Sequence, residues 1–347
     1  MKLGLDIGGT KTDAVAVDDD GTIVERVRLA TGFGADAVIA TAMEGIGRIA
    51  EATGCTPDRF ESIGVGIPGQ VDAVTGSVSH AVNLGFDELD FGHRLEQLLG
   101  REVKVENDVK AAALGAYRLM TTGPGLPASS MAYLNVGTGL AAGLVIDGRL
   151  WRGARGTAGE IGHIPVDPGG VLCPCGQRGC LETVASGSAI ARQWPTDDPI
   201  PVRALLAAAD AGDPAALAVR TLLVDNIAAA VRVLVLTVDV ELVVIGGGLS
   251  NLGAWLLDEV RRVLTSWAEE SPFLASLGLE GRVQLVPAGF PAAAVGAALV
   301  GAPTEAVRSS SGGRDEGAEL DGDAGRPEEG RREEAGREEE RVATWQK

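Results

Sequence analysis

The chain has 347 residues, of which 45% are hydrophobic and 4% aromatic, and its formal net charge is −18 at pH 7. This length predicts two cores of ordinary size, each of about 150 residues. The charge opposes binding to nucleic acid or to an anionic membrane, because both require basic patches. We expect no membrane span, since the longest apolar runs are broken by Asp, Glu or Gly, and no secretory leader before the first strand.

The chain begins with a predicted β-hairpin, MKLGLDIGGTKTDAVAV, whose strands flank a Gly8-Gly9-Thr10 turn. The ordinary phosphate loop and the dinucleotide fingerprint both require a helix after the glycines, so the hairpin excludes them. Glycines in a hairpin still let a phosphate approach the backbone, where Thr10 offers a hydroxyl and Lys11 an amide. Asp6, at the end of the first strand, is placed to hold a hydrated Mg²⁺ ion.

The chemistry is predicted to centre on VKVENDVKAAALGAY, residues 103–117, which reads as a strand ending at Glu106 and an alanine-rich helix. Asn107 and Asp108 lie at the junction, where either could cap the helix and where open α/β sheets bind ligands. Asp108 is the candidate base for a substrate hydroxyl, and Asn107 would orient the same substrate. Lys110 is expected on a solvated helix face, although near a cleft it would lower the pKa of Asp108.

Residues 131–150 repeat the hairpin pattern, with a Gly137-Thr138-Gly139 turn between two predicted strands. Two similar hairpins, some 130 residues apart, indicate duplicated domains that face one another. A nucleotide would then lie between them, and each hairpin would present glycines and a threonine to its phosphates.

The segment GEIGHIPVDPGGVLCPCGQRGCLE, residues 159–182, holds three of the four cysteines and one of the three histidines. The predicted metal ligands are His163, Cys173, Cys175 and Cys180. A Cys₃His set is typical of a closed, structural zinc site. The alternatives are small buried hydrophobes or one disulfide with a spare thiol, which the Cys-x-Cys spacing and a reducing cytoplasm disfavour. Because Glu160 and Glu182 flank the set, zinc would hold two carboxylates in place.

A third glycine turn, VVIGGGLS at residues 243–250, follows a predicted strand and precedes a predicted helix. Its glycines, Gly246, Gly247 and Gly248, suit the nucleoside end of a nucleotide. Each glycine turn alone is more often structural, but three in these contexts predict nucleotide binding. From about Pro303 the sequence has dense mixed charge and few aliphatic residues, which predicts a disordered acidic tail.

These motifs together resemble the ROK family of repressors, open reading frames and kinases, in the family's order. The segments that carry the resemblance are LGLDIGGTKTDAV, VENDVKAAALG, VGTGLAAGLV, GEIGH, CPCGQRGC and IGGGLS. The resemblance implies an α/β, actin-like ATPase fold of the ribonuclease H-like kind, duplicated into two domains around an interdomain cleft. The implied parts are an N-terminal domain over 1–119 completed by a C-terminal helix at 290–302, a C-terminal domain with the zinc loop over 120–289, and the tail over 303–347.

The resemblance also implies a cytoplasmic kinase that passes the γ-phosphate of ATP, with Mg²⁺, to the 6-hydroxyl of a hexose. Glucose is the expected substrate, with N-acetylglucosamine or N-acetylmannosamine as the alternative, and a homodimer or homotetramer is the expected assembly. Asp108 falls at the position of the catalytic base. The implied sugar contacts are Gly69, Asn83, Asn107, Asp108, Glu160, His163 and Glu182. The implied nucleotide contacts are Asp6, Gly8, Gly9, Thr10, Lys11, Gly137, Thr138, Gly139, Gly246, Gly247 and Gly248.

Two alternatives stay open at this point. The hexosamine substrates are motivated by Gly85 and the small turn from Gly66 to Gly69, which would leave space for an acetyl group. The family also contains repressors with a helix-turn-helix ahead of the first hairpin, which here begins at Leu3. A sugar-responsive regulator without a DNA-binding domain is therefore the alternative from another class.

Overall fold

The structure is a computed structural model that describes residues 1–19, 21–122 and 128–301. The acidic tail predicted over 303–347 lies outside the described residues.

The first sheet has five strands in the order β3-β2-β1-β4-β8. Its strands are β1 Lys2–Ile7, β2 Lys11–Val17, β3 Ile23–Ala30, β4 Ile63–Ile67 and β8 Lys104–Asn107. The first three form an antiparallel meander, and β4 and β8 run parallel to β1. In this register Asp6 lies opposite Gly66, and Gly66 lies opposite Glu106. The carboxyl ends of β1, β4 and β8 therefore meet at one edge, where ligands bind in open α/β sheets.

The second sheet repeats this arrangement, with five strands in the order β11-β10-β9-β12-β13. Its strands are β9 Ser130–Val136, β10 Leu140–Ile146, β11 Arg149–Trp151, β12 Leu242–Gly246 and β13 Val283–Leu285. Again a hairpin and a third antiparallel strand are followed by two strands parallel to the first. The same strand order and directions in both sheets confirm the predicted duplication of an α/β unit.

A small antiparallel sheet, which the sequence did not predict, follows β4. Its strands are β5 Gln70–Val71, β6 Val78–Ala81 and β7 Phe86–Leu89, in the order β5-β6-β7. It positions Gly69 and the following residues next to the functional edge of the first sheet, because β5 begins where the turn after β4 ends.

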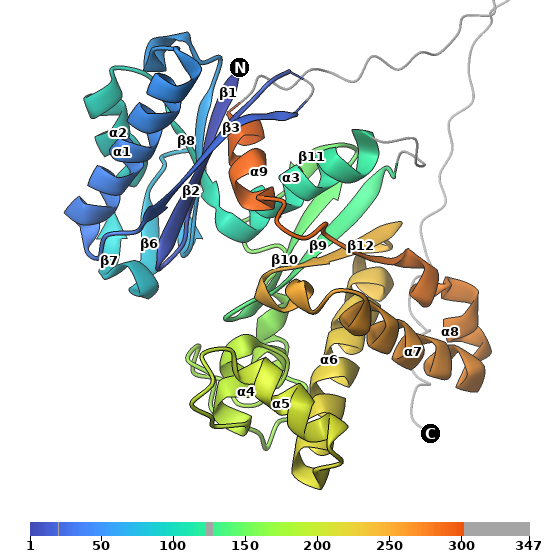
Figure 1. The fold of residues 1–347 in the computed structure, drawn as a ribbon. Helices are drawn as coiled ribbons and strands as arrows, with labels where there is room; N and C mark the ends of the chain where they lie inside the picture. The colour runs from blue at the N-terminus through green and yellow to red at the C-terminus, as the bar shows by residue number, and fades with distance from the viewer. Residues whose placement is uncertain (20, 123–127, 302–347) are drawn as a thin grey trace, which may run out of the picture. The chain divides into compact units, whose positions relative to one another are not determined.

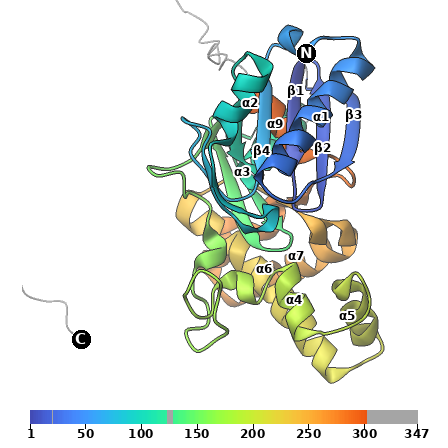
Figure 2. The same cartoon turned by 90° about the vertical axis from the view of Figure 1, so that its left-hand side faces the viewer.

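Helices cover both faces of both sheets (Figures 1 and 2). They are α1 Ala35–Thr53, α2 Phe91–Leu99, α3 Asp108–Thr122, α4 Gly187–Gln193, α5 Pro201–Asp210, α6 Pro214–Val238, α7 Ala254–Glu270, α8 Pro272–Leu277 and α9 Ala292–Val300. Short 3₁₀ helices span Pro57–Arg59, Val82–Leu84, Ile161–His163, Leu181–Thr183, Gly248–Leu252 and Leu279–Arg282. One apolar core forms between α1 and the first sheet, and another forms where α6 and α7 pack on the second sheet.

Helix α9 packs against β1, β4 and α3, although it comes from the C-terminal part of the described chain (Figure 1). The small residues of AAAVGAALV make this approach possible. A Cβ atom at Gly4 would lie 2.0 Å from the Ala294 carbonyl oxygen, and one at Gly296 would lie 1.7 Å from the Ala111 carbonyl oxygen. Helix α3 also packs on β9 and β10, so α3 and α9 lie between the two sheets.

Among the described residues, helix α6 is the one helix with the length and apolar composition that a membrane span would need. It carries Arg220, Asp225 and Arg232 along its length, and Leu223 belongs to the apolar core on the second sheet. The Arg232 guanidinium lies 4.3 Å from the centre of the Trp267 ring on α7. In this structure α6 thus packs as a core helix, with part of its surface against α5 and α7.

Candidate functional site

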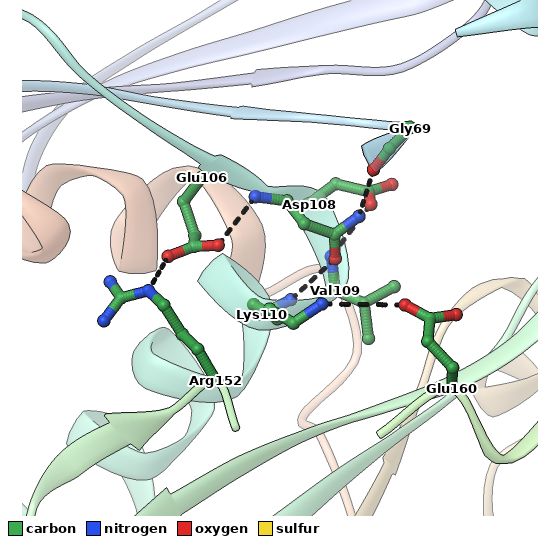
Figure 3. A network of polar contacts seen from close by, with 8 residues as sticks. Gly69, Glu106, Asp108, Val109, Lys110, Arg152 and Glu160 are labelled. Carbon is green, nitrogen blue, oxygen red and sulfur yellow. Dashed lines mark hydrogen bonds and ion pairs between the residues drawn. The ribbon is translucent and has the colours of Figure 1, made fainter. Parts of the chain in front are cut away.

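Asn107 connects three elements at the start of α3. Its Oδ1 accepts hydrogen bonds from the backbone N–H groups of Val109, at 3.1 Å, and Lys110, at 3.2 Å. Asn107 is therefore the side chain that caps the helix at both of these positions. Its Nδ2 donates to the Gly69 carbonyl oxygen at 3.1 Å, which ties the turn after β4 to the first turn of α3 (Figure 3).

Asp6 on β1 and Asp108, directly after β8, bring two carboxyl groups to the carboxyl ends of the strands that flank β4 and its Gly66. A Cβ atom at Gly66 would lie 3.5 Å from Asp108 Cα and 3.6 Å from the Leu5 carbonyl oxygen. Burial, followed by repulsion from Asp108, raises the pKa of Asp6 to about 7. Burial also raises the pKa of Asp108, and the Lys110 charge opposes that rise. Perturbed carboxyl groups gathered in this way are typical of functional sites.

Lys110 is buried, so its predicted place on a solvated helix face is wrong. Only 5% of its surface is exposed, and its Nζ lies 3.6 Å from Glu160 Oε1 (Figure 3). The reason is that the first turn of α3 faces β10, where a Cβ atom at Gly143 would lie 3.2 Å from Lys110 Cα. The sequence shows an alanine-rich helix, but it does not show that this helix is covered on two sides.

The structure adds an ion pair that the motifs did not indicate. Arg152 Nε, just after β11, donates to Glu106 Oε2 at 2.6 Å, and the other Glu106 oxygen accepts the Asn107 N–H at 3.0 Å. Glu106 is 2% exposed, so its carboxylate needs such a partner. The pair joins β8 of the first sheet to the loop after β11 of the second sheet, and its members are too far apart in sequence for a local pattern to reveal.

A cavity of about 450 Å³ lies beside this pair. Its lining includes Gln70 and Ser79 from the small sheet, Glu106 from β8, Lys110 from the first turn of α3, and the loop at 152–156. Because Lys110 both lines the cavity and reaches Glu160, the cavity adjoins the group of predicted substrate residues around Asp108. Its volume suits a small organic ligand.

The predicted metal ligands come together. The donor atoms of His163, Cys173, Cys175 and Cys180 all lie within 4.8 Å of one another. Cys173 Sγ is 3.8 Å from His163 Nδ1, and Cys175 Sγ is 3.6 Å from Cys180 Sγ, too far for a disulfide. In a tetrahedral site with Zn–S bonds of about 2.3 Å, two sulfur ligands lie about 3.8 Å apart. The distances between these donor atoms are close to that value, so the four donors fit zinc.

The cysteine segment also fixes two predicted sugar residues. Glu160 immediately precedes the 3₁₀ turn Ile161–His163, and the His163 N–H donates to the Glu160 carbonyl oxygen at 3.2 Å. Glu182 Oε2 accepts the Leu140 N–H at 3.1 Å, while Oε1 lies 3.8 Å from Cys173 Sγ. Glu160 is therefore linked to the metal-ligand set through its backbone and Glu182 through its carboxylate, and Glu182 also contacts the second glycine turn.

The three glycine turns lie at the carboxyl ends of β1, β9 and β12. In the first turn, the Gly8 N–H donates to the Lys11 carbonyl oxygen at 2.9 Å, and Thr10 is exposed. A Cβ atom at Gly9 would lie 3.3 Å from the Asn83 carbonyl oxygen, so Asn83 lies beside this turn.

The second and third turns adjoin one another. A Cβ atom at Gly137 would lie 3.9 Å from the Gly248 nitrogen, and the N–H of Gly187 at the start of α4 donates to the Gly137 carbonyl oxygen at 2.8 Å. The Ser188 N–H donates in the same way to the Thr138 carbonyl oxygen at 3.1 Å. Gly247 has φ 81°, a left-handed conformation that favours glycine.

Tyr133 on β9 is a further residue that the sequence did not single out. A Cβ atom at Gly246 would lie 2.2 Å from its hydroxyl oxygen, which also receives a hydrogen bond from the Gly247 backbone. Burial raises the pKa of Tyr133, and the charges of Asp6 and Asp108 raise it further. The third glycine turn is thus within electrostatic range of the two aspartates.

Comparisons with known proteins extend over almost all of the described chain. A family model described as the ROK family matches residues 2–300. The chain is 32% identical over 285 residues to a glucokinase of Halalkalibacterium halodurans, a match that covers 77% of this chain and 86% of that protein. It is 32% identical over 269 residues to an N-acetylmannosamine kinase of Vibrio cholerae, covering 76% of this chain and 89% of that protein.

One solved structure with a similar fold is a ROK family glucokinase from Streptomyces griseus in complex with glucose and AMPPNP. It superposes with a TM-score of 0.70 at 32% identity, and the match covers 86% of this chain and 98% of that chain.

Proposed function

The chain belongs to the ROK family, and we propose that it is an ATP-dependent hexose kinase that phosphorylates the 6-hydroxyl of glucose. The observation that carries this proposal is the position of Asp108, a carboxyl group of raised pKa beside Asp6 and near Glu160. The glucokinase and the N-acetylmannosamine kinase among its relatives support phosphoryl transfer to a sugar. The glucose complex of the related structure supports glucose as the acceptor.

Asp108 acts as the general base in this proposal. Its carboxylate takes the proton of the 6-hydroxyl as that oxygen bonds to the γ-phosphorus, and the bond from phosphorus to the β-phosphate oxygen breaks to release ADP. Asn107 would orient the sugar next to Asp108, because its position is fixed by the cap of α3 and by Gly69. A base of raised pKa suits this step, since its conjugate acid holds the proton near neutral pH.

The nucleotide would lie against the three glycine turns, with its phosphates toward Asp6. Burial, and then repulsion from Asp108 and Asp13, raises the pKa of Asp6, so a bound cation would stabilise its charged form. Asp6 is therefore the residue that would hold the Mg²⁺ carried with ATP, and that ion would neutralise charge on the phosphate oxygens. Thr10 and Thr138 would contribute hydroxyl groups from the first and second turns.

The metal-ligand set supports the sugar end of the site. Because His163 presents Nδ1 to the cysteines, its Nε2 points away and is available for a sugar hydroxyl. Zinc, when bound, would keep the cysteine thiols as thiolates and fix the segment in shape. Glu182 would keep one oxygen on the Leu140 N–H and use the other for the sugar. Zinc would take no part in proton transfer, which is the role of Asp108.

The small residues that motivated a hexosamine substrate do not open space for an acetyl group. A Cβ atom at Gly85 would lie 2.6 Å from the Phe33 ring, and one at Gly69 would lie 2.6 Å from the Ser79 carbonyl oxygen. At Gly66 the nearest neighbour is Ala111, at 3.2 Å. These glycines serve close packing, which favours an unsubstituted hexose over an N-acetylhexosamine.

The substrate assignment predicts a ranking of sugars. With ATP and Mg²⁺, kcat/KM for glucose should exceed that for N-acetylglucosamine and for N-acetylmannosamine by roughly tenfold or more, the scale for misfit of one group in a pocket. A coupled ADP-release assay over a panel of hexoses and N-acetylhexosamines measures this, with Asp108→Asn as the background control. A preference for an N-acetylhexosamine would overturn the substrate, and no turnover of any sugar would overturn the kinase.

The raised carboxyl pKa values predict a pH dependence. As pH falls through about 7, Asp6 gains a proton, and Asp108 also protonates above the usual range of an aspartate. Because both must be ionised, kcat/KM for glucose should rise between roughly pH 5.5 and pH 8. The same shifts mean that the folded state binds these protons more tightly than the unfolded state, so this contribution to stability is lost as pH rises through about 7. A flat kcat/KM profile over that range would contradict the assignment.

Several expectations from the sequence remain predictions. They are the cytoplasmic location, the homodimer or homotetramer, the domain limits at 1–119, 120–289 and 290–302, and the absence of nucleic-acid and membrane partners. A cytoplasmic location fits the chemistry of the cysteine segment, because metal binding by thiols requires that they stay reduced.

A further inference from the structure

Lys110 is a buried charged residue to which the proposed mechanism gives no role. It is 5% exposed and follows Asp108 by two residues in the first turn of α3. Moving an ammonium group out of water is unfavourable unless a partner compensates. Among the described residues, Glu160 is the only acidic side chain that forms an ion pair with Lys110, and the distance is 3.6 Å.

Lys110 and Glu160 differ in burial and in how firmly the fold holds them, and this difference shows which residue positions the other. The Glu160 side chain is 44% exposed, so water can solvate its carboxylate without an ion pair. The Lys110 side chain is only 6% exposed, so its ammonium group depends on the ion pair. Lys110 is held on α3, which packs on α9 and β10, while Glu160 precedes a short 3₁₀ turn in the cysteine segment. The rigid member is therefore the lysine, and the member whose orientation it restricts is the glutamate.

The position of the pair is also informative. Lys110 lines the 450 Å³ cavity, and its charge acts on Asp108. Asn107, which caps the same turn, fixes the Lys110 backbone N–H at 3.2 Å. The junction of β8 and α3 thus carries Asn107 for substrate orientation, Asp108 for the proton and Lys110. Lys110 faces Glu160 (Figure 3).

We propose, as an extension of the hexose kinase function, that Lys110 is a positioning residue that holds the Glu160 carboxylate in the orientation that binds the acceptor sugar. It acts through Glu160 and does not touch the reacting atoms. The carboxylate then accepts hydrogen bonds from the sugar without first giving up rotational freedom, which lowers the cost of binding. ATP binding does not depend on this pair.

A double-mutant cycle tests whether Lys110 acts through Glu160. The variants are Lys110→Met, Glu160→Gln and the two combined, with kcat and KM measured for glucose and for ATP. Each single variant should raise KM for glucose about tenfold, within the range measured for coupled neighbours, and the combined variant should be no worse than Glu160→Gln alone. KM for ATP should stay within about twofold in all three.

Three further measurements separate positioning from folding. Lys104 lies on β8 and forms an exposed ion pair with Glu102, so Lys104→Met removes a positive charge away from Glu160 and should leave KM for glucose unchanged. Lys110→Arg should restore part of the affinity that Lys110→Met loses, because it keeps the charge. Methionine is apolar and of similar length, so the thermal midpoint of Lys110→Met should not fall below that of wild type.

The outcomes distinguish this inference from the function on which it rests. If wild type phosphorylates no hexose, the kinase proposal fails, and calorimetric binding of glucose to the same variants then decides the role of Lys110. If wild type is active, effects of the two substitutions on KM for glucose that simply multiply would overturn the inference alone. An unchanged KM for glucose in Lys110→Met would also overturn the inference.

Discussion

Asp108→Asn should lower kcat by roughly a hundredfold or more, the scale of a lost general base, while the dissociation constant for glucose stays within about threefold. Asparagine keeps the shape and the hydrogen bond to the Val109 N–H through its carbonyl oxygen, at the site where Asp108 accepts it at 2.9 Å. It cannot take the proton of the 6-hydroxyl. Rapid-mix kinetics with saturating ATP, together with calorimetric binding of glucose, measure the two quantities.

Stability gives this experiment an internal check. Because burial raises the pKa of Asp108, its charged form is disfavoured in the folded state near neutral pH, and asparagine removes that cost. The thermal midpoint should therefore equal or exceed that of wild type. Asp90→Asn is a matched control, since Asp90 is exposed and makes no side-chain cap to α2. Near-normal turnover of Asp108→Asn, or a loss equal to that of the control, would reject Asp108 as the base.

Cys175→Ser should abolish tight zinc binding and lower the thermal midpoint by roughly 5 to 15 °C, because ligand loss from a structural site costs several kcal/mol. Cys175 is the exposed cysteine of the set, so serine changes the metal ligand without removing a core side chain. The segment has little core of its own. Several of its apolar side chains are exposed, namely Ile164, Val166, Val171 and Leu172. Zinc content by mass spectrometry and calorimetric melting measure both effects.

The same variant should raise KM for glucose, since Glu160 and His163 belong to the segment that the metal would fix. Cys55→Ser provides the control, because Cys55 is a free cysteine outside the ligand set. Full zinc content with an unchanged melting temperature in Cys175→Ser would show that the set does not hold a structural metal. An equal fall in melting temperature in Cys55→Ser would show that the protein is destabilised by any cysteine substitution and not by loss of the metal.

The architecture could be predicted from the sequence wherever a local pattern was strong. Alternating strands around glycine turns indicated both hairpins, and their repetition indicated the duplicated unit that the two sheets confirm. The spacing of the cysteines and His163 predicted one metal site, and the four donor atoms lie within 4.8 Å of one another. The small sheet was missed because its strands are two to four residues long, too short to show a period.

Features that depend on long-range packing could not be predicted in this way. Lys110 was placed in solvent because the sequence of α3 does not reveal that α9 and β10 both cover it. The ion pair of Glu106 and Arg152 joins residues that no motif connects. Gly85 suggested empty space, but the Phe33 ring from a distant loop lies against it. In each case the deciding neighbour comes from another part of the chain.

The most direct test of phosphoryl transfer is the identity of the product formed from ATP, Mg²⁺ and glucose by the purified protein. Phosphorus NMR with proton correlation should show one sugar phosphomonoester, with phosphorus coupled to the protons on carbon 6 and in amount equal to the ADP released. Release of inorganic phosphate without a sugar phosphate, or phosphate on a different hydroxyl, would contradict the account.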